Sequence, residues 1–560
     1  MAACRAGTEV LPIFIWAPEE EGVFSPGRSS RWWVENSLEK LSEQIKVLGS
    51  RLLYFRAQTS KEALIPFIRE NNIDALYFNH LYDPISLVRD NRVRMEVQNM
   101  GVHVETFGSE LLYEPWEILD KNGKPFVTFE NVYNAITSMA YEPLVPIPAP
   151  LVLPPVDSDF VGSNETVASL QILQAEERET CEHLNVNWTP GSQAAWAQWE
   201  HFIMNKLKTF ATTKGRVDKA FTSQLSPYLH YGEISIRRIF YNLKHLRLDC
   251  EARQVSSESI DHYLRQMGYR EYSRYILFHN PFTHERPMLE HLRAVPWTYD
   301  QELFQLWQQG TTGYPLVDAA MHELWASGYC HNRLRVVVAH FLVKYLNLPW
   351  QWGLKYFWDT LIDADLECDT LGWQYISGCM VDAHPYSYIM DYETECRNFD
   401  PNGTYVRKWL PLLSRLNKDC IHKPWEAPAL VLRAAGVELG TTYPHRVVNM
   451  EQVRRQVEHA CKCIEKKAVG EDSGPFRHPT KSENTFQNGA PSNTQTTEID
   501  WGKEVYSQYT NAKLLQEKKQ QLLLQQQQSY VSQNEEEVEG GGEEGGGEKS
   551  AVVEDVAESS

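Results

Sequence analysis

Three hydroxyl side chains stand just before a proline and an apolar helical segment. They are Thr222, Ser223 and Ser226 in the run FTSQLSPYLHYGEIS. Hydroxyls cap helix starts, and the free backbone amides there, at the positive end of the helix dipole, can hold a phosphate group. Taken alone, the pattern favours a helix cap without a ligand. Beside other cofactor-binding residues, it would indicate a phosphate contact.

A second group of residues combines arginines with carboxylates. Arg333 and Arg335 begin RLRVVVAHFLVKYL, which is apolar nearly all round and is therefore predicted to be a buried helix. Buried charges need partners, or they destabilise the fold. The segment DADLECDTLGWQ supplies the acidic counterparts Asp363, Asp365 and Asp369. By themselves these residues would be structural ion pairs.

Asp369 and Trp373 are four residues apart, so a helix would place a carboxyl group and an indole on one face. Together they can face a redox-active ring. The chain has 17 tryptophans, and Trp297, Trp350 and Trp373 lie in apolar neighbourhoods. Because large aromatic side chains usually belong to the core, these three alone do not indicate an electron path.

The candidate residues fall in the second of two predicted domains. From residue 9 to 130, short apolar runs alternate with amphipathic helical segments, which predicts βαβ units and a doubly wound parallel α/β domain over 1–130. Long helical-period segments predict a mostly α-helical domain over 191–460. The predicted linker, 131–190, contains the proline-rich run PLVPIPAPLVLPPV, which is typical of an extended segment.

The composition changes again near the end of the chain. Apolar periodicity stops after about residue 470, and EEEVEGGGEEGGGEK cannot bury a core. We therefore predict a disordered, acidic and glutamine-rich C-terminal tail over 461–560. A helical stretch within 513–528 can form transiently or on binding a partner.

Charge and cysteine usage narrow the function classes. The formal net charge is -20, which disfavours non-specific nucleic-acid binding but leaves a local basic patch open. The ten cysteines form no CxxC pair, so neither a zinc site nor a disulfide framework is expected and a reduced, intracellular compartment fits best. No signal peptide or run of eighteen apolar residues is found, so we expect a soluble protein that does not enter a membrane.

Longer blocks of sequence surround the candidate residues. They include WAPEEEGVFSPGRSSRWW, FNHLYDPISLVRD, LLYEPWE, REYSRYILFHNP, YFWDTLIDADLECDTLGWQY and FDPNGTYVRKWLP. In order and spacing, these blocks resemble the cryptochrome/photolyase family over most of residues 9–450. The resemblance is closest to plant-type cryptochromes, with a plant photolyase-like side branch as the alternative.

The resemblance implies a doubly wound α/β domain followed by a helical domain that binds FAD in a bent conformation. By position, Thr222, Ser223 and Ser226 are expected to contact the FAD phosphates. Phe210 replaces a tyrosine that many members carry nearby. The remaining residues that the resemblance places at the flavin are Arg335 paired with Asp363, Asp365, Asn332, and the photoreduction triad Trp373, Trp350 and Trp297, of which Trp373 lies nearest to the flavin.

The resemblance also separates a photoreceptor from a repair enzyme. Asp369 stands opposite flavin N5, where plant cryptochromes carry an aspartate that can donate a proton and photolyases carry an asparagine. Gln266 and Tyr269 replace the glutamate and tryptophan of pyrimidine-dimer photolyases, and Asn332 and Val336 replace the histidine pair of (6-4) photolyases. Neither repair pocket is complete, which favours the photoreceptor.

Three features depart from the plant cryptochrome pattern. Asn332 is a photolyase-type residue, and the tail lacks the DQxVP and STAES blocks. By the resemblance, the family's first strand and its RRDLR segment would precede AACRAGTEVLPIFIW, so we expect either an N-terminally shortened form of the sequence or a sheet edge that is built differently. An antenna pterin, methenyltetrahydrofolate, is therefore left open.

The sequence thus predicts a blue-light photoreceptor that is not an enzyme, with a light-dependent DNA photolyase as the alternative. Unidentified signalling proteins are the expected partners, together with a homo-oligomer in light and at most weak DNA binding. The nucleus, the cytoplasm or both are the expected location. A flavin-binding scaffold without light signalling is the third reading.

Overall fold

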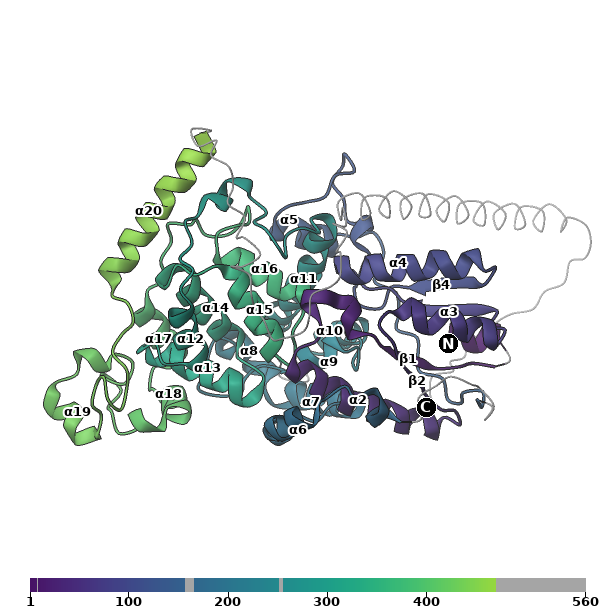
Figure 1. Cartoon of the computed structure of the whole chain (residues 1–560), viewed down its shortest axis with the longest axis horizontal. Coiled ribbons are helices and arrows are strands. Elements are labelled where there is room, and N and C mark those ends of the chain that lie inside the picture. Colours follow the sequence, from purple (N-terminus) through teal and green to yellow (C-terminus); the bar gives the residue numbers. More distant parts are fainter. Residues whose placement is uncertain (8, 157–165, 251–254, 470–560) are drawn as a thin grey trace, which may run out of the picture. The chain divides into compact units, whose positions relative to one another are not determined.

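The computed structural model describes residues 1–7, 9–156, 166–250 and 255–469 (Figure 1). Residues 470–560, which contain most of the predicted tail, lie outside the described residues. Four short strands, all in the first 110 residues, form the α/β part. They are β1 (Ile13–Trp16), β2 (Leu53–Arg56), β3 (Ala75–Asn79) and β4 (His103–Phe107).

Helices connect these strands as the predicted βαβ units require. α1 (Ala2–Ala6) and the 3-10 helix η1 (Pro18–Phe24) flank β1, and the connecting helices are α2 (Arg28–Val47), α3 (Ser60–Glu70) and α4 (Pro84–Asn99). Side chains fix two of the helix starts: the Thr59 hydroxyl accepts from the amide of Glu62, and Asp83 accepts from the amides of Ile85 and Ser86. These caps satisfy amide groups that a helix leaves unpaired.

Alternate residues of β1 face two helical layers. Phe14 and Trp16 pack with Leu38 of α2, whereas Ile13 and Ile15 pack against the cluster formed by α3 and α4. Successive side chains of a strand point to opposite faces, so this strand is covered on both sides. Helices on both faces of parallel strands are the arrangement of a doubly wound domain.

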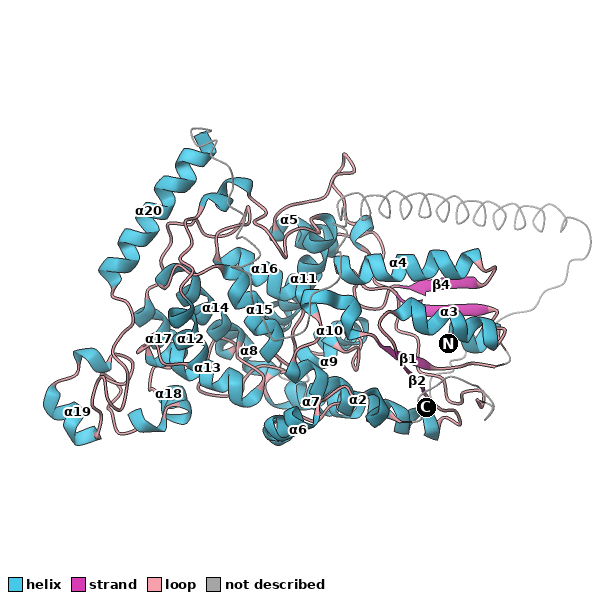
Figure 2. Ribbon diagram, in the orientation of Figure 1, coloured by secondary structure: helices cyan, strands magenta, loops and turns pink. Residues whose placement is uncertain are grey.

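The four strands do not form the one continuous sheet that the alternating pattern suggested. β1 pairs in parallel with β2, from Ile13 opposite Leu53, and β3 pairs in parallel with β4, from Ala75 opposite His103. Among the described residues the two pairs are separate sheets (Figure 2). A sheet continues only through hydrogen-bonded neighbours, and no described strand bridges the two pairs.

The predicted linker is only partly extended. Its beginning overlaps α5 (Phe129–Thr137), and its second half contains η3 (Val167–Leu170), α6 (Ala175–Cys181) and η4 (Glu182–Val186). Residues 143–150 carry no helix or strand, in agreement with their prolines. The helices follow apolar side chains that the sequence analysis passed over, including Val132 and Ile136, which are buried in the core of the helical part.

Helices make up the rest of the described chain. They are α7 (Ser192–Asn205), α8 (Phe210–Thr213), α9 (Ser226–His230), α10 (Ile236–Leu248), α11 (Ser257–His279), α12 (Gln301–Gln309), α13 (Pro315–Ser327), α14 (Asn332–His340), α15 (Trp350–Thr360), α16 (Leu366–Ile376), α17 (Tyr392–Phe399), α18 (Thr404–Trp409), α19 (Ala429–Ala435) and α20 (Met450–Val469). Short 3-10 turns join several of them, among them η6 (Glu290–Ala294).

The segment predicted as a buried helix is α14 followed by a π-helical turn, η7 (Phe341–Tyr345). Leu334, Val337 and Val338 are buried in the largest core cluster of the molecule, and so are the apolar residues of η7. A π-helical turn is rare and costs regular hydrogen bonding, so its presence marks a place of special packing.

The last described helix corrects one boundary. α20 runs to Val469, so residues 461–469 are helical and do not belong to an irregular tail. Ala460 and Ile464 are buried and pack with residues of η6 and its neighbourhood. None of the described helices is both long and apolar enough to cross a membrane.

Candidate functional site

A half-buried guanidinium and a buried carboxylate form the centre of the candidate site. Arg335, in the first turns of α14, donates from Nη2 to both carboxylate oxygens of Asp363 at 2.8 Å, and from Nε to the backbone oxygen of Cys330 at 2.8 Å. The Asp363 side chain is 3% exposed. Burial opposes the charged form of Arg335, but Asp363 more than compensates and raises its pKa. The structure thus brings together the pair that the sequence predicted.

Asp365 begins α16 and is held by a second arginine. Its carboxylate accepts from the amide of Cys368 at 2.8 Å, as a helix cap, and from Arg274 Nη2 at 2.5 Å. Arg274 is 1% exposed and also donates to Glu110 at 3.0 Å. Burial would raise the pKa of Asp365, but the Arg274 guanidinium, aided by His230, lowers it far below its usual value.

Sequence reasoning missed Arg274 and Glu110. Arg274 lies on α11 within the quoted run REYSRYILFHNP, and Glu110 follows β4, so three distant segments meet at Asp365. The spacing of Arg270 and Arg274, one helical turn apart, was the only available signal. Glu110 gave none, because its partner is 164 positions away in the chain.

Asp369 lies on α16 one turn after Asp365 and is 8% exposed. Its Oδ2 accepts from the backbone amide of Asp365 at 3.2 Å. Among the described residues no arginine, lysine or histidine forms an ion pair with it, and burial raises the pKa of Asp369 to about 7 although Arg335 acts in the opposite direction. This carboxyl group can therefore both hold and release a proton at neutral pH.

Trp373 follows Asp369 by one turn and fits tightly against α15. Its ring lies 5.2 Å from the Phe357 ring, edge to face. A Cβ on Gly353 would come within 2.0 Å of the indole, so only glycine lets α15 approach this side chain. Trp373 is 2% exposed and is held in one position by its surroundings.

The other two tryptophans of the predicted path belong to the same apolar region. Trp350, the first residue of α15, is completely buried, and its indole Nε1 has no hydrogen-bond partner within the described part of the chain. Trp297 is half-buried and packs against the core cluster that contains Trp350 and Trp373. The structure brings all three into one region and orders them by exposure, with Trp297 the most exposed.

The predicted phosphate-binding hydroxyls lie at the start of α9. Ser226 is its first residue and is exposed, and Gln224 before it adopts a left-handed conformation at φ 55°. Ser223 Oγ accepts from the hydroxyl of Tyr263 at 3.1 Å. Tyr263 also packs against Phe210 with ring centroids 5.6 Å apart, so it supplies a hydroxyl beside a position that Phe210 leaves without one.

Asn332 is the first residue of α14 and is exposed, three positions before Arg335. The helix cap is His331, whose Nδ1 accepts from the amide of Arg333 at 3.1 Å. Burial lowers the pKa of His331 to about 4, so its ring is neutral at physiological pH. Arg333 is exposed and takes no part in the buried pairs, contrary to the expectation for the second arginine of the helix.

The positions that correspond to repair pockets lie on α11 and α14. Gln266 and Tyr269 are exposed, and Val336 is half-buried. The Tyr269 ring stacks on Phe129 of α5 with centroids 3.7 Å apart and an angle of 8°. Phe129 therefore covers one face of the Tyr269 ring.

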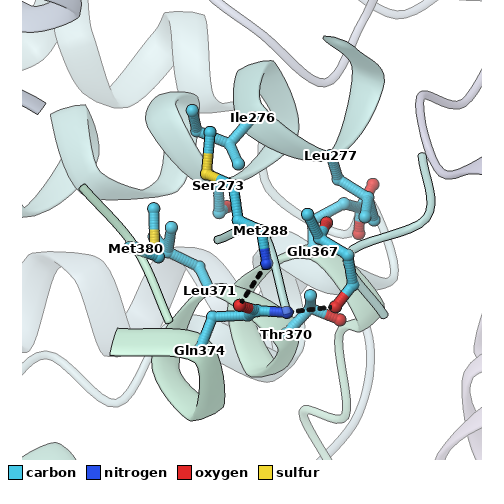
Figure 3. Close-up of a pocket in the computed structure, with 10 residues that line it drawn as sticks. Ser273, Ile276, Leu277, Met288, Glu367, Thr370, Leu371, Gln374 and Met380 are labelled. Atoms are coloured by element: carbon cyan, nitrogen blue, oxygen red, sulfur yellow. Dashed lines mark hydrogen bonds between the residues drawn. The ribbon is translucent and has the colours of Figure 1, made fainter. Parts of the chain in front are cut away.

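A small pocket lies on the other face of α16 and is not this site (Figure 3). It is bordered by α11 and α16, with Glu367, Thr370 and Gln374 among its lining residues. Gln374 is saturated, since it accepts from the amide of Met288 and donates to two backbone oxygens. This pocket is enclosed packing, whereas Asp369 and Trp373 occupy a different face of the helix.

The residues brought together fit a bound flavin nucleotide by their chemistry. Hydroxyls suit its phosphates, a guanidinium and carboxylate pair suits the polar edge of the ring, and a carboxyl that titrates near neutral pH beside an indole suits redox chemistry. These features are those of a flavoprotein with an α/β part and a helical part.

Comparison with known proteins agrees with this class. The family described as DNA photolyase matches residues 1–151, and the FAD-binding domain of DNA photolyase matches residues 263–463. The chain is 44% identical to Cryptochrome-1 and 45% identical to Cryptochrome-2 of Arabidopsis thaliana, in each case over 82% of this chain, and over 67% and 76% of those proteins. It belongs to the cryptochrome/photolyase family, and its helical domain binds FAD.

Photolyases are also among the similar proteins. A deoxyribodipyrimidine photo-lyase of Agrobacterium fabrum is 32% identical over 83% of this chain and 95% of its own length. The crystal structure of a bacterial class III photolyase from Agrobacterium tumefaciens superposes with a TM-score of 0.77 at 32% identity, over 83% of this chain and 94% of that chain. Both the predicted fold class and the family assignment are therefore confirmed.

Proposed function

We propose that this protein is a blue-light photoreceptor whose FAD is reduced through Trp297, Trp350 and Trp373 and protonated by Asp369. One observation carries the proposal: a buried carboxyl with a pKa of about 7 lies one helical turn from a buried indole. The plant cryptochromes among its relatives support the same assignment.

Bound FAD would supply light-driven one-electron chemistry at this position. Trp373 would give up the electron, because it is the path residue on the same helical face as Asp369. Trp350, which is fully buried and has no hydrogen-bond acceptor among the described residues, would return an electron to Trp373. Trp297, half-buried, is the member that external reductants can reach.

Asp369 would hold the proton that follows the electron to flavin N5. Because burial raises the pKa of Asp369 to about 7, its carboxyl group can carry that proton near neutral pH. Once the proton has left, a new carboxylate stands beside the Asp363 and Asp365 ion pairs. The added negative charge would change the electrostatic interactions of these two ion pairs and could shift the segments that carry them.

This role implies a class of partner. We propose that signalling proteins recognise the light state, with a homo-oligomer as one form, in the nucleus, the cytoplasm or both. The antenna pterin stays a prediction, as do the phosphate contacts of Thr222, Ser223 and Ser226.

A DNA photolyase is the second candidate, favoured by the Agrobacterium relatives and by the exposed, stacked ring of Tyr269. Aromatic rings of this kind can stack on an extruded base. Light-dependent repair of a pyrimidine-dimer oligonucleotide by the purified protein would establish this function in place of the first.

The test of the photoreceptor uses Asp369→Asn in the full chain with FAD bound. We expect blue light still to bleach the oxidised flavin band, which reports arrival of the electron. Absorbance in the red, which also requires the proton, should be lost or delayed. Asp419→Asn, at an exposed position, is the matched control and should behave as wild type.

Trp350→Phe tests the path separately. Phenylalanine keeps most of the apolar volume but is much harder to oxidise, so bleaching should be slow or absent while FAD stays bound. Undiminished bleaching in this variant, or undiminished red absorbance in Asp369→Asn, would contradict the corresponding part of the proposal.

A further inference from the structure

Lys344 is a buried lysine outside the site described above. It lies in the π-helical turn η7 and is 2% exposed. Its Nζ donates to the backbone oxygen of Tyr386 at 2.9 Å and lies 3.3 Å from the centroid of the Tyr386 ring. Within the described part of the chain, no carboxylate acts on it. The cation is therefore held by a carbonyl and an aromatic face, without neutralisation.

Tyr386 places this lysine beside Trp297. The two rings meet edge to face with centroids 6.4 Å apart, so about 10 Å at most separates Lys344 Nζ from the indole. Asn347, just after η7, fixes the tryptophan segment, because its Nδ2 donates to the backbone oxygen of Pro296 at 2.8 Å. Trp297 thus packs against the largely apolar cluster that contains Tyr386, the residue that holds Lys344.

The ionisable groups that face Lys344 are uncharged near neutral pH. Burial raises the pKa of Cys379 to about 12 and also raises that of Cys461, which comes from α20. Burial lowers the pKa of His340, in the preceding turn, to about 3, and raises that of the Tyr386 phenol. None of these groups supplies a negative charge that would screen the ammonium.

Burial also lowers the pKa of Lys344 itself, to about 7. The ammonium and the free amine are therefore both populated at neutral pH. Over about 10 Å, the electrostatic potential of a charge that neither water nor a counter-ion screens is far larger than that of the same charge at the surface.

We propose that Lys344 is a positioning residue that sets the electrostatic potential at Trp297 and so controls how readily that tryptophan is oxidised. The ammonium opposes a positive charge on the indole, and the free amine permits it. In the controlled step, one electron passes from Trp297 to the oxidised Trp350 and leaves one positive charge on Trp297. No bond forms or breaks and no proton moves. The inference rests on the proposed function, which assigns Trp297 as the outer donor.

The experiment compares two variants of the full chain with FAD bound. Lys344→Met removes the charge at similar length, and Lys344→Arg makes it permanent. Bleaching of the blue flavin band is measured from about pH 6 to about pH 8. The wild-type yield should rise by about tenfold over this range. The bleaching yield of Lys344→Met should be high at every pH, and that of Lys344→Arg should be low at every pH. The wild-type yield should therefore resemble that of Lys344→Arg at about pH 6 and that of Lys344→Met at about pH 8. Lys418→Met, at an exposed position, should follow wild type.

A wild-type pH profile retained in Lys344→Met would overturn the inference, even if Lys344→Arg failed to fold. Trp350→Phe is measured alongside: if it bleaches fully, the proposed path is wrong, whereas if it is blocked and Lys344→Met shows no effect, only the role of Lys344 is wrong.

A dark measurement tests the buried charge without light. The free energy of unfolding of wild type, relative to Lys344→Met, should rise between pH 7 and pH 10, because the unfolded chain then binds more protons. A constant difference would show that Lys344 is not a buried titrating cation, which would also overturn the inference.

Discussion

Buried charges are treated in two ways in this protein. At the start of α16, Arg335 pairs with Asp363 and Arg274 pairs with Asp365, and pairing raises the pKa of both arginines. Asp369 and Lys344 are equally buried, but in the described chain neither forms an ion pair, and burial brings the pKa of each to about 7. Pairing fixes charge, whereas burial without a partner makes charge adjustable.

This contrast distinguishes residues that hold the site in shape from residues whose charge can change. A paired guanidinium stays charged at any physiological pH and gives the site its shape. An unpaired acid and an unpaired base that titrate near neutrality can each change state during a reaction. Under the proposed function, Asp369 would supply a proton and Lys344 would act on the outer electron donor, so the comparison predicts different responses to mutation and to pH.

The largest effect is expected from breaking a pair. Asp363→Ala leaves Arg335 buried without its carboxylate, which should cost about 3–5 kcal/mol of unfolding free energy and reduce the FAD content. Chemical denaturation and the flavin absorbance of the purified protein measure both. Asp419→Ala, at an exposed position, is the control. Unchanged stability and flavin content would show that the pair does not support the site.

Replacing the unpaired lysine should have the opposite sign. The folded-state pKa of Lys344 lies below its ordinary value, so the ammonium destabilises the folded state where it would be charged in the unfolded chain. At pH 7, Lys344→Met should therefore exceed wild type in stability by about 1–3 kcal/mol, and this difference should decline toward pH 10. Loss of stability at pH 7 would mean that the ammonium is satisfied after all.

Asp369 should show the mirror-image dependence. Its folded-state pKa is raised from 3.8 to about 7, so its contribution to stability is present at low pH and is lost as the pH rises toward 7. The free energy of unfolding of wild type should fall between pH 4 and pH 7. In Asp369→Asn this fall should be smaller by about 1–3 kcal/mol. Thermal unfolding of both proteins across this range decides the point, and parallel curves would contradict it.

The smallest effect is expected from removing the end of the chain. Truncation after Val469 keeps α20, which packs against the helical part through Ala460 and Ile464. The melting temperature and FAD content should match those of the full chain. Truncation after residue 449, which also removes α20, should lower both, since it exposes the cluster of Tyr386 and Lys344. Equal behaviour of the two truncations would show that α20 is dispensable.

The sequence by itself determined much of this protein. Apolar periodicity predicted βαβ units followed by helices, because the period of burial differs between strand and helix. The motif blocks indicated the family and FAD. The four-residue spacing of Asp369 and Trp373 predicted that they share one helical face. The acidic segment 28 positions after Arg335 predicted its partner, Asp363.

Tertiary structure decided the rest. The break between the two sheets, the partners Arg274 and Glu110 of the site, and the contact of Lys344 with Tyr386 depend on segments that meet only when the chain folds. In the sequence, Lys344 is a single lysine within a segment predicted to be a buried helix, and nothing near it in the chain indicates a role. Its displaced pKa arises from burial without a counter-charge, and burial is a property of the whole packed structure, so no local pattern of residues could reveal it.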